Sequence, residues 1–279
     1  MLALAAAGPV AMVPVPRAAG TVILAVDVST SMAADDVAPS RLAAAQRAAR
    51  AFVEAQPDSV DIGVVAFGRA ALITARPDGD HTVALKAIDR LKPEGGTSLG
   101  TAIVTALSAI TGEQVGFGRD GALPDLGYWP SATIVMFTDG QDRGGAGEGA
   151  SGQGSGQGGG QGGGQGGDVE LAAAAAQKAG VRVHTVGVGT KAGTTVEVDG
   201  YHLQTSLEED TLTMIARTTG GGYHAASDVA RLDGIADTID LRLTVSDEPL
   251  PLAGALIGLA LALLAGGAAR TVFRTGRVI

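Results

Sequence analysis

Side chains that carry oxygen stand at three separate places along this chain, each beside a predicted strand end or helix start. Three of them end or follow the apolar run TVILAVD, one lies in the glycine-rich segment GGTS, and one lies at the end of SATIVMFTD: Asp27, Ser29, Ser31, Thr97 and Asp139. Carboxylate and hydroxyl oxygens are hard ligands that suit Mg²⁺, Mn²⁺ or Ca²⁺. If the fold brings the three places together, these side chains predict a site for one divalent cation.

Apolar runs alternate with helical patterns through the middle of the chain. Uninterrupted apolar runs predict buried strands, and apolar residues every three or four positions predict helices. The predicted strands are 21–27, 60–67, 70–75, 131–139, 181–189 and 222–225, with a hairpin over 195–205. The predicted helices are 41–56, 80–91, 99–111, 168–179, 207–220 and 227–239. This alternation is typical of an α/β fold with a doubly wound, mostly parallel sheet flanked by helices.

In such sheets, ligands bind beyond the carboxyl ends of the strands, and the oxygen-bearing residues fall at that edge. A nucleotide would be the default ligand, but the first strand is followed by DVSTSM and by neither of the glycine-rich phosphate-binding motifs. The net charge of -9 argues against nucleic-acid binding. The absence of cysteine excludes disulfides, thiol catalysis and zinc–thiolate sites.

The D-x-S-x-S pattern over 27–31, the downstream Thr97 and the T-D-G pattern over 138–140 resemble the metal-ion-dependent adhesion site of von Willebrand factor A domains. The resemblance covers about residues 20–240, and later segments resemble bacterial membrane-tethered members of the aerotolerance (Bat) type. It implies one bound ion, Mg²⁺ before Ca²⁺ or Mn²⁺, surrounded partly directly and partly through water by Asp27, Ser29, Ser31, Thr97 and Asp139.

The two ends of the chain are apolar. Residues 250–269 carry no charge, and a helix of this length spans roughly 30 Å, the thickness of a bilayer core. Arginines occur in the tail 270–279 and acids precede the span, so the positive-inside rule predicts an extracytoplasmic domain in the cell membrane. Residues 241–249 are predicted as a linker. Residues 1–19 are apolar but rich in proline, which leaves open a partial transmembrane helix or a signal-like segment, and one or two membrane passes.

Residues 144–167 consist almost entirely of glycine, glutamine and serine. Such a composition offers no apolar surface to offset the entropy lost on ordering, so it predicts a flexible insertion within the domain.

Only two of the five candidate ligands are anionic, so a bound dication would remain electrophilic and could accept an aspartate or glutamate from a partner protein. This favours a membrane-anchored, metal-dependent protein-binding module without enzymatic activity.

Two alternatives remain open. One is a subunit of a MoxR- or chelatase-like AAA-ATPase assembly, which the family resemblance implies; the chain has no Walker motif, so the ATPase would be another protein. The other is a metal-dependent hydrolase, which needs a base and an acid beside the metal. The sequence places none of the four histidines near the site: His81, His184, His202 and His224.

Overall fold

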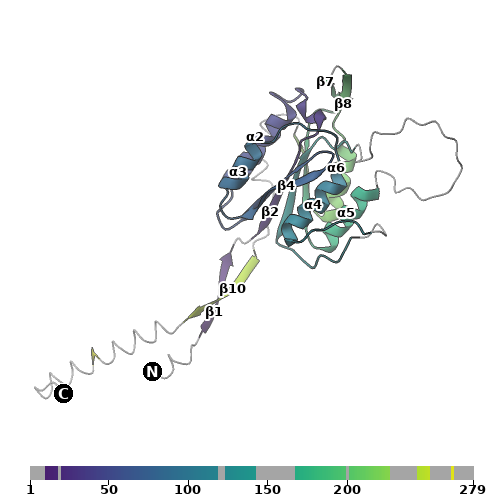
Figure 1. The fold of residues 1–279 in the computed structure, drawn as a ribbon. Coiled ribbons are helices and arrows are strands. Elements are labelled where there is room, and N and C mark those ends of the chain that lie inside the picture. The colour runs from purple at the N-terminus through teal and green to yellow at the C-terminus, as the bar shows by residue number, and fades with distance from the viewer. Residues whose placement is uncertain are drawn as a thin grey trace, which may run out of the picture. The chain divides into compact units, whose positions relative to one another are not determined.

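The computed structural model describes residues 10–17, 20–118, 123–142, 167–198, 201–226, 244–251 and 265–266 (Figure 1). The chain divides into two units, Ala18–Leu243 and the pair of ends Met1–Arg17 and Thr244–Ile279. The predicted helix over 227–239 and the tail 270–279 lie outside the described residues. So does nearly all of the predicted insertion over 144–167 and most of the predicted span over 250–269.

The larger unit is built on a six-stranded sheet, in the order β4-β3-β2-β5-β6-β9. All neighbouring strands are parallel except β4, which runs antiparallel to β3 at one edge. The strands are β2 (Thr21–Asp27), β3 (Asp61–Phe67), β4 (Ala71–Asp78), β5 (Ala132–Thr138), β6 (Arg182–Val188) and β9 (Tyr223–Ala226). The mostly parallel α/β sheet expected from the sequence is therefore confirmed.

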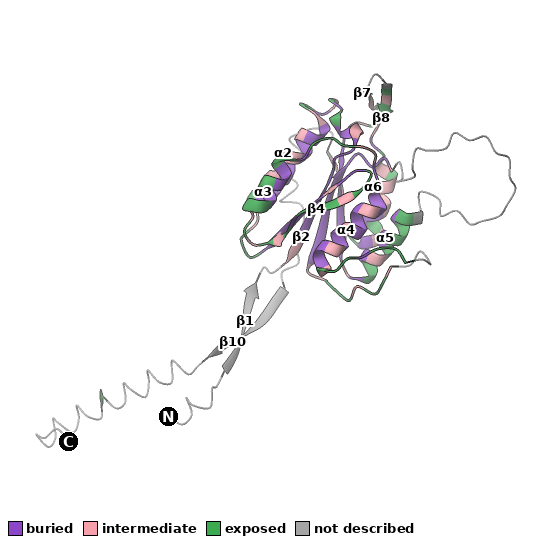
Figure 2. Ribbon diagram, viewed as in Figure 1, coloured by how far each residue is buried: buried purple, intermediate pink, exposed green. Residues whose placement is uncertain are grey.

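Helices cover both faces of this sheet (Figure 1). One face carries α2 (Arg41–Glu54) and α3 (Thr82–Asp89). The other carries α4 (Leu99–Thr111), α5 (Gly167–Lys178) and α6 (Glu209–Thr219). Figure 2 shows that the central strands β2, β3, β5 and β6 are almost entirely buried, whereas the edge strand β4 has exposed residues.

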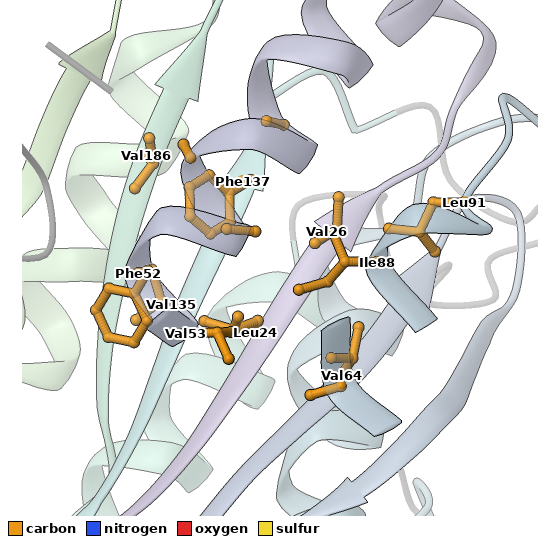
Figure 3. Close-up of a cluster of buried hydrophobic side chains, with 14 of the residues drawn as sticks. Leu24, Val26, Phe52, Val53, Val64, Ile88, Leu91, Val135, Phe137 and Val186 are labelled. Carbon is orange, nitrogen blue, oxygen red and sulfur yellow. The ribbon is translucent and has the colours of Figure 1, made fainter. Parts of the chain in front are cut away.

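The central strand β2 supplies side chains to both cores. Val22, Leu24 and Val26 belong to the cluster beneath α2 and α3, whereas Ile23 and Ala25 belong to the cluster beneath α4 and α5. This alternation follows from the two-residue period of a strand, and it explains why an uninterrupted apolar sequence is needed here. Figure 3 shows the first cluster, in which side chains of β2, β3, β5 and β6 meet those of α2 and α3.

Two serines fix where helices begin near the carboxyl edge of the sheet. Ser40 precedes α2, and its side chain accepts a hydrogen bond from the Ala43 amide at 3.2 Å. Ser98 precedes α4 and accepts in the same way from the Thr101 amide at 3.4 Å. These N-caps satisfy amides that have no partner within the helix.

The smaller unit contains an antiparallel ribbon of β1 (Val10–Arg17) and β10 (Thr244–Pro251). Strand β1 lies within the N-terminal segment 1–19, and β10 includes most of residues 241–249, for which the sequence predicts a linker. The four prolines of the ribbon disfavour a helix, and they fall in one alternating set of register pairs: Pro14 with Asp247, Pro16 with Val245, Pro249 with Met12, and Pro251 with Val10. Leu250 and Pro251, predicted to begin the membrane span, are the last residues of β10.

Within the ranges that the structure describes, no helix has both the length and the apolar character needed to cross a bilayer.

Candidate metal centre

The first predicted ligand, Asp27, lies where β2 ends beside the end of β5. Val26 of β2 pairs with Phe137 of β5, so Asp27 and Thr138 follow side by side. Asp27 is fully buried. Its Oδ2 accepts a hydrogen bond from the Thr138 hydroxyl at 2.5 Å, and its Oδ1 accepts one from the Ser29 amide at 2.7 Å. Both carboxylate oxygens are thus held in place by the adjoining backbone and strand.

The two serines stand on the short 3₁₀ helix η1 (Thr30–Ala33), with Ser29 at its start and Ser31 inside it. Their hydroxyl oxygens lie 3.0 Å apart, and both residues are buried. The tight turn of η1 therefore brings the two hydroxyls of the D-x-S-x-S pattern together.

Thr97 reaches the same edge through contacts between two loops. Thr30 donates from its amide and its hydroxyl to the carbonyl of Gly95, at 2.9 and 2.8 Å. The Glu94 amide also donates to the carbonyl of Val28. Gly95 has a φ of +70°, a conformation that suits glycine. Thr97, two residues further on, is buried directly before the cap of α4.

Asp139 follows β5 and is fully buried. Its Oδ1 accepts a hydrogen bond from the Gln141 amide at 3.1 Å. Its Oδ2 accepts two, from Arg41 Nη1 at 2.9 Å and from the Thr205 hydroxyl at 3.2 Å. Thr205 ends a two-stranded hairpin made of β7 (Thr194–Val198) and β8 (Tyr201–Thr205).

The electrostatics of this edge favour a cation. Burial, and after it the negative charge of Asp139, raises the pKa of Asp27 to about 7, although the hydrogen bonds from Thr138 and Ser29 act in the opposite direction. Two carboxylates buried this close together are unfavourable unless a positive charge lies between them. Their oxygens and the serine hydroxyls are the donors that a hard dication prefers, so the residues present fit such an ion.

Among the described residues, no three histidine, cysteine, aspartate or glutamate side chains gather into a metal-binding group. A cation at this edge would therefore depend on hydroxyl groups and water in addition to Asp27 and Asp139.

The sequence over residues 22–141 matches the family model of the von Willebrand factor type A domain. The chain contains a von Willebrand factor type A (VWA) domain. A UPF0353 protein of Mycobacterium bovis is 30% identical to it over 245 residues, which cover 87% of this chain and 66% of that protein. The chain thus spans just under two thirds of that relative's length.

Solved structures share the fold of this chain. BatB from Bacteroides thetaiotaomicron matches with a TM-score of 0.58 and 26% identity, over 78% of this chain and 96% of that one. An aerotolerance-related membrane protein from Bacteroides fragilis, solved with multiple mutations to serines, matches with a TM-score of 0.57 and 23% identity, over 79% of this chain and 98% of that one.

Sequence reasoning missed Arg41, a charged residue at this edge of the VWA domain. Arg41 is fully buried, and it holds Asp36 through Nε at 2.7 Å and Nη2 at 2.8 Å. Asp36 in turn accepts hydrogen bonds from the amide and hydroxyl of Thr190, at 3.0 and 2.9 Å. One signal was present in the sequence: Arg41 is the first residue of α2, where the helix dipole disfavours a positive charge.

Proposed function

We propose that the VWA domain binds one divalent cation, Mg²⁺ before Mn²⁺ or Ca²⁺, through Asp27, Ser29, Ser31, Thr97 and Asp139. The observation that carries this proposal is the pair of fully buried carboxylates beside two buried hydroxyls that lie 3.0 Å apart.

The charges around the site support an ion of charge two. When ionised, the carboxylates of Asp27, Asp36 and Asp139 contribute three negative charges, and Arg41 contributes one positive charge. Two negative charges then remain in a largely buried cluster, and a divalent cation balances them. The cation would also make the buried ionised form of Asp27 favourable.

The bound ion, we further propose, recruits a protein partner through an aspartate or glutamate side chain. Mg²⁺ requires about six oxygen ligands in an octahedral arrangement. Three of the five candidate ligands are neutral, and several of the five already form hydrogen bonds within the protein. Water would therefore fill part of the coordination shell, and a carboxylate from a partner can displace that water. The affinity of the partner then depends on the metal.

In this proposal the site binds a partner and catalyses no reaction. Two of the four histidines lie too far from the site to act as an acid or a base beside the cation. His81 Nε2 lies 2.8 Å from the carbonyl of Val60, which precedes β3 and so stands at the amino end of the sheet. His184 lies near the amino end of β6, and its Nδ1 accepts a hydrogen bond from the Gly222 amide at 3.2 Å. Both are placed away from the carboxyl edge.

Membrane attachment through residues 250–269, with the VWA domain outside the cytoplasm, completes the proposal. It rests on the uncharged sequence of that segment and on the arginines that follow it.

The test is a titration of the purified chain with Mg²⁺ by calorimetry, followed by selection of displayed peptides on the Mg²⁺-loaded chain. We expect Mg²⁺ binding that Asp139→Ala abolishes and that the control Asp125→Ala retains, since Asp125 is an exposed acid that forms a long ion pair with Lys178 at 3.9 Å. Peptides released by EDTA should carry an acidic residue that cannot be replaced by its amide. Binding of Mg²⁺ that survives Asp139→Ala, or selected peptides without an acid, would refute the proposal.

A further inference from the structure

Arg41 joins the candidate metal centre to two other parts of the VWA domain. Its Nη1 donates to Asp139 Oδ2 at 2.9 Å and to the Thr205 hydroxyl at 3.0 Å. Its Nε and Nη2 grip both oxygens of Asp36. The guanidinium is completely buried, so these contacts are not shared with solvent.

The contacts of Arg41 limit what Asp139 can offer to a cation. Each carboxylate oxygen has about two acceptor positions. Oδ2 already accepts from Arg41 and from Thr205, and these two donors also bond to each other. Within the described residues Oδ1 accepts one hydrogen bond, from the Gln141 amide, which leaves one acceptor position on that oxygen.

The position of Arg41 is itself held from the opposite side. Asp36 binds the guanidinium in a two-pronged arrangement, which fixes the plane of the group as well as its distance. Thr190, two residues after the end of β6, holds Asp36 through two further hydrogen bonds. A rigid support of this kind keeps a carboxylate in one orientation.

We propose that Arg41 is a positioning residue of the metal centre, which fixes the Asp139 carboxylate so that Oδ1 alone faces the cation. This inference rests on the proposed metal site and names a residue outside the five ligands. Fixing Asp139 in one orientation suits Mg²⁺, which demands near-ideal octahedral geometry, more than Ca²⁺, which accepts irregular arrangements.

The test compares Arg41→Lys with Arg50→Lys in the full chain. Lysine keeps the charge but loses the planar fork. Arg50 lies on the same helix, is exposed, and also binds two acids, Asp89 and Glu54. We expect Arg41→Lys to weaken Mg²⁺ binding by about 10- to 100-fold, as loss of a ligand's support typically does, and to weaken Ca²⁺ binding less. Arg50→Lys should bind both ions as the wild type does.

A purely structural role for Arg41 would give a different result. Arg41→Lys would then lower the melting temperature of the metal-free chain but leave the Mg²⁺ dissociation constant and the Mg²⁺/Ca²⁺ preference unchanged, which would overturn the inference. If Arg41→Lys does not fold, Thr205→Val decides, because it removes one of the two donors to Oδ2 and keeps Arg41. A smaller loss of Mg²⁺ affinity with the same shift in preference supports the inference, and wild-type binding overturns it.

The two proposals fail in different ways. If the wild-type chain does not bind Mg²⁺, or if Asp139→Ala binds as well as the wild type, the metal site itself is wrong. If the wild type binds, Asp139→Ala does not, and Arg41→Lys is indistinguishable from the wild type, only the role of Arg41 is wrong.

Discussion

A substitution of Thr138 tests most directly whether a hydrogen bond to a predicted ligand, and not packing alone, supports metal binding. Its hydroxyl donates to Asp27 Oδ2 at 2.5 Å and accepts from the Gly140 amide at 3.1 Å, and both Thr138 and Asp27 are fully buried. Valine has nearly the same shape but no hydroxyl. Thr138→Val therefore removes a hydrogen bond to a charged group and leaves the Gly140 amide without that acceptor.

The magnitude follows from these contacts. A hydrogen bond to a charged group contributes about 1.5–3 kcal/mol to stability. For a domain of this size, about 2 kcal/mol corresponds to a fall in melting temperature of roughly 4–8 °C. Mg²⁺ affinity should fall by about tenfold or more, because Asp27 loses the group that orients it.

The assay is thermal unfolding by circular dichroism and Mg²⁺ calorimetry, both at pH 8, where Asp27 is ionised. Thr133→Val is the matched control, since Thr133 lies on the same strand, is buried, and stands near its amino end. The control should leave Mg²⁺ affinity unchanged. The reasoning is refuted if the two valine variants lose Mg²⁺ affinity equally, or if neither loses any.

Two further predictions concern pH and backbone geometry. Because the pKa of Asp27 is raised, the folded metal-free chain holds a proton between about pH 4 and pH 7 that the unfolded chain has lost, so the free energy of unfolding should fall as the pH rises over this range. Denaturant titrations should show that Asp27→Asn flattens this dependence. A free energy of unfolding that rises over this range would contradict the prediction. Gly140 has a φ of +80°, and a Cβ there would lie 2.5 Å from the carbonyl oxygen of Glu208. Gly112 has a similar φ of +73°, but a Cβ there would meet open space. Gly140→Ala should therefore lower the melting temperature more than Gly112→Ala does, and equal decreases would show that the strain at Gly140 comes from the backbone conformation alone.

Sequence reasoning recovered the strands because burial on both faces leaves a strong apolar signal. Asp27 and Asp139 stand out because each ends such a run at its carboxyl end, and the topology then places those ends at one edge. Thr97 was placed by the glycines before it, and the structure brings its loop to η1 through Gly95.

The supporting charges could not be predicted in this way. Arg41 meets Asp139 across 98 positions of sequence and Thr205 across 164, and no local pattern encodes such distances. Asp36 reads as a solvated turn residue until the fold brings Arg41 and Thr190 against it. The ribbon was missed for a similar reason, because its two strands come from opposite ends of the chain and are read there as unrelated apolar segments.

The placement of prolines in that ribbon has a consequence for association between molecules. Proline has no amide hydrogen, so in an antiparallel ribbon it must occupy a register pair that forms no hydrogen bonds across the ribbon. The backbone groups of such a pair point away from the partner strand. Pro14 and Pro16 then remove donors from the outer edge of β1, and Pro249 and Pro251 remove them from the outer edge of β10. A third strand therefore finds an unbroken row of amides on neither edge, which disfavours edge-to-edge aggregation of the ribbon.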